Sequence, residues 1–135
     1  MTIGGEQQLS VLLDTHVFLW WITGATRLSA QHRRLIVAPE QTVYVSAVTG
    51  WEIALMVKLG KWPDAAALVP ELETAIAAEG LEILDVTLSQ AKRAGSLELI
   101  HRDPFARLLV AQSMSLGIPI ATVDPALKLL GAVVV

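Results

Sequence analysis

The chain has 135 residues, about the length of one domain, of which 53% are hydrophobic and 17% are charged. It contains no cysteine, which excludes disulfide scaffolds, cysteine-ligated metal sites and thiol catalysis. The composition also excludes a disordered chain or a coiled coil, and no apolar run approaches the roughly 20 residues of a membrane span. The net charge of −3 does not indicate the basic surface that is typical of nucleic-acid-binding proteins.

The first residues lack the basic region of a signal peptide, so we expect a cytoplasmic protein without a membrane anchor. Apolar residues exceed what so small a core can use, which predicts a surface that binds a partner. No repeat, low-complexity tract or charged linker divides the chain. We therefore expect one domain over residues 1–135, with residues 1–8 as a disordered N-terminal extension.

Hydrophobic periodicity and turn residues predict alternating strands and helices. In chain order we expect strand 9–13, helix 15–22, helix 30–37, strand 42–46, helix 47–59, helix 65–79, strand 81–85, helix 89–98, helix 104–116, strand 118–123, a short helical turn at 127–130 and strand 132–135. Ser29 and Asp64 are the expected N-caps of the second and fourth helices. The alternation predicts a parallel α/β sheet with helices on both faces.

Three acidic residues are predicted to meet at one edge of this sheet. Asp14 ends the first strand, Glu52 lies in the helix that follows the second, and Asp124 follows strand 118–123. In open parallel sheets, function lies at the carboxyl ends of the strands. These acids are therefore candidate site residues.

Each of these acids also has a structural interpretation. Asp14 suits the N-cap of the helix after it, and Asp124 suits a turn or cap before Pro125. Glu52 has apolar neighbours and no basic residue three or four positions away, so its charge lacks an obvious partner within the helix. For Glu52 the functional and structural interpretations have equal weight.

The stretch from His101 to Leu109 is the most distinctive part of the sequence. Asp103 and Pro104 fit the N-cap and first position of a helix. The third helical position, which favours an acid, is Ala106.

With this stretch, four motifs resemble the PIN domain of VapC-type toxins, the ribonuclease half of bacterial toxin–antitoxin pairs: Leu13-Asp14-Thr15-His16, Ser46 to Trp51-Glu52, His101-Arg-Asp-Pro-Phe105, and Thr122-Val-Asp124. The resemblance implies a PIN-like three-layer α/β/α fold with a central, mostly parallel sheet of four to five strands. It also implies a metal-dependent endoribonuclease that holds Mg²⁺ or Mn²⁺ with four acids and is neutralised by a cognate antitoxin. A homodimer is implied as well.

Carried over position by position, the family's first, second and fourth acids are Asp14, Glu52 and Asp124. The third, catalytic in the family, falls on Ala106, which predicts an impaired enzyme because hard cations need several oxygen ligands. Because the rest of the motif is intact, we favour an engineered replacement over a naturally degenerate member. Asp103, nearby on the same helix, is an alternative metal ligand, although a capping role fits it better.

Other residues near the acids have expected supporting roles. Thr15, Ser46 and Thr122 border the acids and are candidates for orienting ligands or water, or are ordinary cap and strand hydroxyls. His101, Arg102 and Arg107 are candidate contacts to RNA phosphates, with an ion pair or stacking role as the alternative. The four tryptophans suit core or partner contacts better than base stacking: Trp20, Trp21, Trp51 and Trp62.

Two other functions remain open at this point. One is a non-catalytic PIN-like domain that binds RNA or a protein. The other is a phosphoacceptor signalling domain, for which Asp85 is the candidate acceptor, although Thr122-Val-Asp-Pro supplies no lysine.

Overall fold

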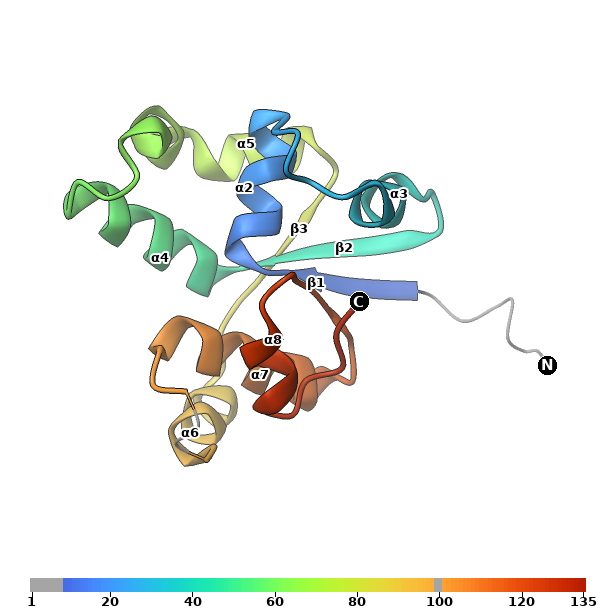
Figure 1. Ribbon diagram of the computed structural model, residues 1–135, viewed down its shortest axis with the longest axis vertical. Coiled ribbons are helices and arrows are strands. Elements are labelled where there is room, and N and C mark those ends of the chain that lie inside the picture. Colours follow the sequence, from blue (N-terminus) through green and yellow to red (C-terminus); the bar gives the residue numbers. More distant parts are fainter. Residues whose placement is uncertain (1–8, 99–100) are drawn as a thin grey trace.

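The computed structural model describes residues 9–98 and 101–135 and shows one parallel sheet (Figure 1). Within these residues the strands are β1 (Leu9–Leu13), β2 (Gln41–Ser46), β3 (Glu82–Leu84) and β4 (Ile120–Ala121), in the order β3-β2-β1-β4. The predicted α/β class and parallel sheet are confirmed. The extension expected at residues 1–8 lies outside the described residues.

Helices cover both faces of the sheet, which makes the three-layer arrangement visible in Figure 1. On one side lie α2 (Thr15–Thr23), α3 (Ala30–Val37) and α5 (Leu72–Ala78), and on the other α6 (Leu88–Ser96), α7 (Pro104–Leu116) and α8 (Pro125–Leu129). Helix α4 (Ala47–Lys58) contacts α2 and α7, and the 3₁₀ segment η1 (Pro63–Glu71) packs on α4. None of the described helices has the length and apolar character needed to cross a bilayer.

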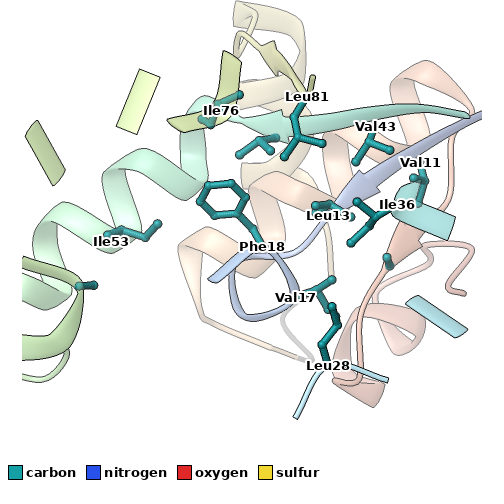
Figure 2. Packing of buried hydrophobic residues seen from close by; sticks show 13 residues of the cluster. Val11, Leu13, Val17, Phe18, Leu28, Ile36, Val43, Ile53, Ile76 and Leu81 are labelled. Atoms are coloured by element: carbon teal, nitrogen blue, oxygen red, sulfur yellow. The ribbon is translucent and has the colours of Figure 1, made fainter. Parts of the chain in front are cut away.

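The two hydrophobic cores share strand β1. Val11 and Leu13 belong to the first core, which Figure 2 shows together with Phe18 of α2. Leu12 belongs to the second core, with Phe105 of α7 among its members. This split follows from the alternation of side chains along a strand whose two faces are both covered. The short apolar run at residues 11–13 therefore lies in a strand that is covered on both faces.

The cap residues that the sequence indicates begin most of the helices. Asp14, Ser29 and Asp103 each accept a hydrogen bond from a backbone N–H in the first turn of α2, α3 and α7. Gly24 and Gly117 end α2 and α7 with φ values of 68° and 67°, a conformation that favours glycine. The boundaries of these helices are therefore set by local chemistry.

The prediction of a single helix over residues 65–79 is wrong. The chain there forms η1 and then α5, and Asp64 lies inside η1 instead of capping it, because Pro63 occupies the first position after Trp62. Pro70 cannot donate a backbone hydrogen bond and its ring clashes with the preceding turn, so an unbroken α-helix cannot pass through it.

Two of the predicted C-terminal strands are shorter than expected. Strand 118–123 is reduced to β4, and residues 132–135 form an isolated parallel bridge between Val134 and Ile120 instead of a named strand. The backbone of Val135 nevertheless donates to the Ile120 carbonyl, and Ile120 donates to that of Val133. This segment therefore covers the outer edge of β4.

The connection order creates a gap at one edge of the sheet. From β1 the chain passes to β2 and β3 on one side and later returns to β4 on the other. Such a reversal of direction separates the loops after the two strands and leaves a crevice at their carboxyl ends. The residues that follow β1 and β4 include Asp14 and Asp124.

Candidate functional site

A small cavity of about 70 Å³ lies at the carboxyl ends of β1 and β4. Four carboxylate side chains from four separate segments line it, together with residues of α2, α7 and α8: Asp14, Thr15, His16, Glu52, Asp103, Ala106, Leu109, Asp124 and Leu127. We call it the acidic pocket. The predicted convergence of Asp14, Glu52 and Asp124 on one edge of the sheet is thus observed, and Ala106 opens onto the same cavity.

Asp14 is held by two hydrogen bonds. Its Oδ1 accepts from the Val17 backbone N–H at 2.9 Å, and its Oδ2 accepts from the Thr122 hydroxyl. Burial raises the pKa of the Asp14 carboxyl above its usual value, and the bonds from Thr122 and Val17 only partly oppose this. Asp14 is therefore both a helix cap and a fixed, desolvated carboxylate.

Glu52 is buried on α4, with 9% of its surface exposed. Burial raises the pKa of its carboxyl, the Thr15 hydroxyl opposes the rise, and the negative charges of Asp103 and Asp14 add to it. The Thr15 hydroxyl also lies 3.1 Å from that of Thr49. Among the cationic side chains that the structure describes, only His16 lowers the pKa of Glu52 or Asp14.

Asp103 and Asp124 reach the acidic pocket from the starts of α7 and α8. Each caps its helix: Asp103 accepts from the Phe105 N–H and Asp124 from the Ala126 N–H, both at 2.9 Å. Asp124 is exposed and Asp103 is half-buried. In these two residues the capping and site interpretations are compatible, since the cap uses one oxygen and leaves the other available.

Ala106 lies at the third position of α7 and is only 6% exposed. It packs in the second core and also lines the acidic pocket. A longer acidic side chain at this position would therefore point its carboxylate toward the other four.

The donor set has the right chemistry for a hard divalent cation, because carboxylate oxygens are the ligands that Mg²⁺ and Mn²⁺ prefer. The acids are not, however, gathered into a closed cluster: no three Asp, Glu or His side chains among residues 9–98 and 101–135 form a group that could hold a metal ion. Asp14, Glu52, Asp103 and Asp124 fit the cation in kind, and position 106 contributes no oxygen.

The predicted threonines border the acids, but Ser46 does not. Its hydroxyl accepts from the Val48 N–H as the cap of α4 and donates to Oε1 of the fully buried Gln112. The Gln112 amide nitrogen in turn donates to the Asp85 carbonyl and to Gln90. Ser46 therefore belongs to a structural network between α4, α6 and α7 and not to the acidic pocket.

The expected RNA contacts separate in the structure. Arg107 is buried, and its guanidinium donates to four backbone carbonyls at or beyond the end of α6: Gly95, Leu97, Glu98 and His101. This corrects its assignment as an RNA contact, because the side chain is buried and its guanidinium is engaged with these carbonyls. Arg102 is exposed, and Nδ1 of the half-buried His101 accepts from the Asp103 N–H.

The position of Asp85 argues against the phosphoacceptor alternative. Asp85 follows β3, which is an edge strand, and the pocket residues do not include it.

His16, to which the sequence pattern assigned no role in the site, also lines the acidic pocket. The available signal was its place two residues after Asp14, in the first turn of the helix that Asp14 caps.

Comparisons with known proteins agree with this fold. The profile of the PIN domain family matches residues 11–132, so the chain belongs to the PIN domain family. A search of curated proteins finds no significant match.

Solved structures with the same fold include chains of three other proteins. A chain of VapBC2 from Rickettsia felis, solved with a DNA fragment from its promoter, has a TM-score of 0.69 and 13% identity, covering 94% of this chain and 98% of that one. VapC20 of Mycobacterium tuberculosis, described as a sarcin–ricin loop cleaving toxin, has a TM-score of 0.63 and 14% identity, covering 91% of this chain and 96% of that one. FitAcB of Neisseria gonorrhoeae has a TM-score of 0.64 and 22% identity, covering 92% of this chain and 95% of that one.

Proposed function

We propose that this PIN domain is a metal-dependent endoribonuclease of the VapC toxin type, acting on cytoplasmic RNA and impaired by alanine at position 106. One observation carries the proposal: four carboxylates from four segments line one cavity at the point where the sheet reverses direction. The similarity to VapC20, which is described as cleaving the sarcin–ricin loop, supports RNA as the substrate class.

Unpaired carboxylates in a partly buried cavity are unfavourable unless a cation or protons accompany them. Burial raises the pKa of both the Asp14 and the Glu52 carboxyl, as this cost predicts. The arrangement therefore supports a site that is completed by a divalent cation.

Asp14, Glu52 and Asp124 are the proposed metal ligands, and Asp103, which lines the same cavity, is an alternative ligand for which the capping role fits better. When bound, Mg²⁺ or Mn²⁺ would supply an activated water and would neutralise charge that develops on the scissile phosphate. The protein's own part is to position oxygens. Thr122 and the Val17 N–H fix the two oxygens of Asp14, and the Thr15 hydroxyl forms one hydrogen bond with the Glu52 carboxyl.

Restoring the missing acid is the direct test. The Ala106→Asp variant should cleave a single-stranded RNA in millimolar Mg²⁺ at least 100-fold faster than the chain with Ala106, since loss of one preorganised electrostatic group commonly costs two to three orders of magnitude. Ala106→Asn, which adds similar bulk without charge, is the matched control. Equal and rapid cleavage by all three proteins would show that position 106 is not part of the site.

A non-catalytic PIN domain that binds RNA or protein is the second candidate. It is favoured by Ala106 and by the absence, among the described residues, of three side chains grouped for a metal. The two functions differ in one experiment. If Ala106→Asp binds RNA but neither cleaves it nor gains thermal stability from Mn²⁺, the non-catalytic function is correct.

Partners follow from the same proposal. A toxin of this type implies a cognate antitoxin, and we also propose a homodimer with an interface of standard size. Exposed apolar side chains such as Leu88, 80% exposed, and Ile83 provide apolar area for such contacts. A strictly monomeric species in light scattering at tens of micromolar would exclude the homodimer.

A further inference from the structure

A second, larger hollow lies beside the acidic pocket. It has a volume of about 410 Å³ and is lined by residues of α2, the following loop and the start of η1. We call it the tryptophan groove, after its members His16, Trp20, Arg27, Lys61, Trp62 and Leu68. His16 lines both the groove and the acidic pocket, so the two hollows are adjacent.

Three aromatic rings contribute to the groove wall, beside aliphatic residues such as Leu19 and Ile22. The centroid of the His16 ring lies 5.3 Å from that of Trp62, in an edge-to-face arrangement, and 5.9 Å from that of Trp20. Both tryptophans are only partly buried, and their inner parts pack against the first core. The rings are therefore held in place from behind while part of each remains accessible.

The charge of the groove differs from that of the chain. Arg27 and Lys61 are exposed cations on its wall, and Asp64 is its one acid. The Arg27 guanidinium lies 5.0 Å from the centre of the Trp20 ring, and neither cation forms an ion pair with any residue that the structure describes. Although the net charge of the chain is −3, this groove holds two cations without ion-pair partners among the described residues, beside aromatic rings. Such a site suits a ligand that combines a negative charge with a planar ring.

We infer that the tryptophan groove is a nucleotide subsite for single-stranded RNA, in which one base stacks on Trp62 or Trp20 and a neighbouring phosphate contacts Arg27 or Lys61. Stacking on aromatic side chains within a basic groove is how single strands are commonly held. The inference rests on the proposed function for its choice of RNA. Its position next to the acidic pocket would place the bound nucleotide close to the phosphate that is cleaved.

A protein partner is the competing occupant, and the groove fits it less well. The molecule has another hollow of about 440 Å³ near α4 and α5, lined by Val69, Leu72, Ile76 and Ile83. No aromatic ring or cation lines that hollow, which suits an aliphatic peptide face. The tryptophan groove combines rings with cations, the combination that nucleotides require.

The test is equilibrium binding of fluorescein-labelled decauridine and decaadenosine RNA, measured by anisotropy in EDTA with the protein as it stands, so that cleavage plays no part. Trp62→Leu should weaken binding about ten-fold, in line with the loss of one stacked base, whereas Trp62→Phe should retain most of the affinity. Decamers with abasic ribose throughout should bind the parent protein as weakly as normal decamers bind Trp62→Leu.

The cations supply a second, independent measurement. Lys61→Gln and Arg27→Gln should each lower the slope of log K against log salt by about 0.7, the value for one phosphate contact to a single strand. Lys92→Gln and Arg33→Gln, which remove exposed cations away from the groove, are the matched controls and should leave the slope unchanged. These surface variants remain informative if Trp62→Leu fails to fold.

Equal RNA affinity for the parent, Trp62→Leu and Lys61→Gln proteins would overturn the inference, and would be the result if the groove bound a protein partner instead. Failure of the proposed function is distinguishable. If Ala106→Asp does not cleave RNA but decamer binding still depends on Trp62 and Lys61, the subsite stands and the nuclease does not. If cleavage occurs with affinity independent of the groove, only the subsite is wrong.

Discussion

The Thr122 hydroxyl donates a hydrogen bond to the Asp14 carboxylate, joining the end of β4 to the end of β1 across 108 positions of the chain. This bond lowers the pKa of Asp14 against the larger effect of burial, which raises it. Thr122 therefore positions an acidic oxygen of the pocket and also favours its charged form.

Replacing Thr122 by valine tests this role. Thr122→Val keeps the shape of the side chain and removes the donor, so the pKa of Asp14 should rise further above its usual value. The measurement is a carbon-13 NMR titration of the Asp14 carboxyl. Thr122→Ser, which retains the hydroxyl, is the control and should titrate like the parent; an identical titration for Thr122→Val would show that the bond has no effect in solution.

Glu52 makes the stability of the protein depend on pH. Its pKa is raised by folding, so the folded state holds a proton that the unfolded state releases, and stability falls as pH increases from the ordinary glutamate value through the raised one. Glu52→Gln should therefore raise the melting temperature by a few degrees at pH 7 and should have little effect at pH 4. Exposed Glu40→Gln is the control. A loss of stability at pH 7 in Glu52→Gln would show that the carboxylate has a stabilising partner.

Arg107 should be among the most important polar side chains for stability. Its guanidinium donates to four carbonyls near the end of α6, and its removal leaves all four acceptors without that donor. We expect Arg107→Ala to lower the free energy of unfolding by about 3 kcal/mol in urea denaturation. Arg102→Ala, at an exposed position in the same segment, should change it by less than about 0.5 kcal/mol. Similar losses of unfolding free energy in Arg107→Ala and Arg102→Ala would contradict this role of Arg107.

Asp103 has a capping role that can be separated from its charge. Asparagine is as good an N-cap as aspartate, so Asp103→Asn should change stability by less than about 0.5 kcal/mol, whereas Asp103→Ala should cost about 1 kcal/mol. In the Ala106→Asp background we expect Asp103→Asn to retain the increase in melting temperature that Mn²⁺ causes. Loss of that increase would identify Asp103 as a metal ligand.

The location of the acidic pocket can be predicted from sequence because it depends on simple rules. Strands of a parallel sheet end at a common edge, so residues such as Asp14 and Asp124 that follow them must lie near one another. The cap positions of α2, α3 and α7 follow from single residues in the same way. Local chemistry and topology were sufficient for these features.

Other features depend on contacts between segments that no local pattern records. Arg107 is buried because the end of α6 lies against α7, and Ser46 turns away from the acids because Gln112 offers it a buried acceptor. The tryptophan groove exists because Trp62, after α4, lies against His16 of α2. In each case the residue type was visible in the sequence but its partner was not.

The bond between Thr122 and Asp14 also constrains when the pocket can form during synthesis. A ribosome must add 108 residues after Asp14 before Thr122 exists to hold it. Until then β1 has only β2 as a neighbour in the sheet, and the acids after β1 and within α4 lack Asp124 and the residues of α8 that line the cavity. A nascent chain can therefore form its first strands and helices while the cleft is incomplete, so that a nuclease built this way would stay inert until translation is almost complete.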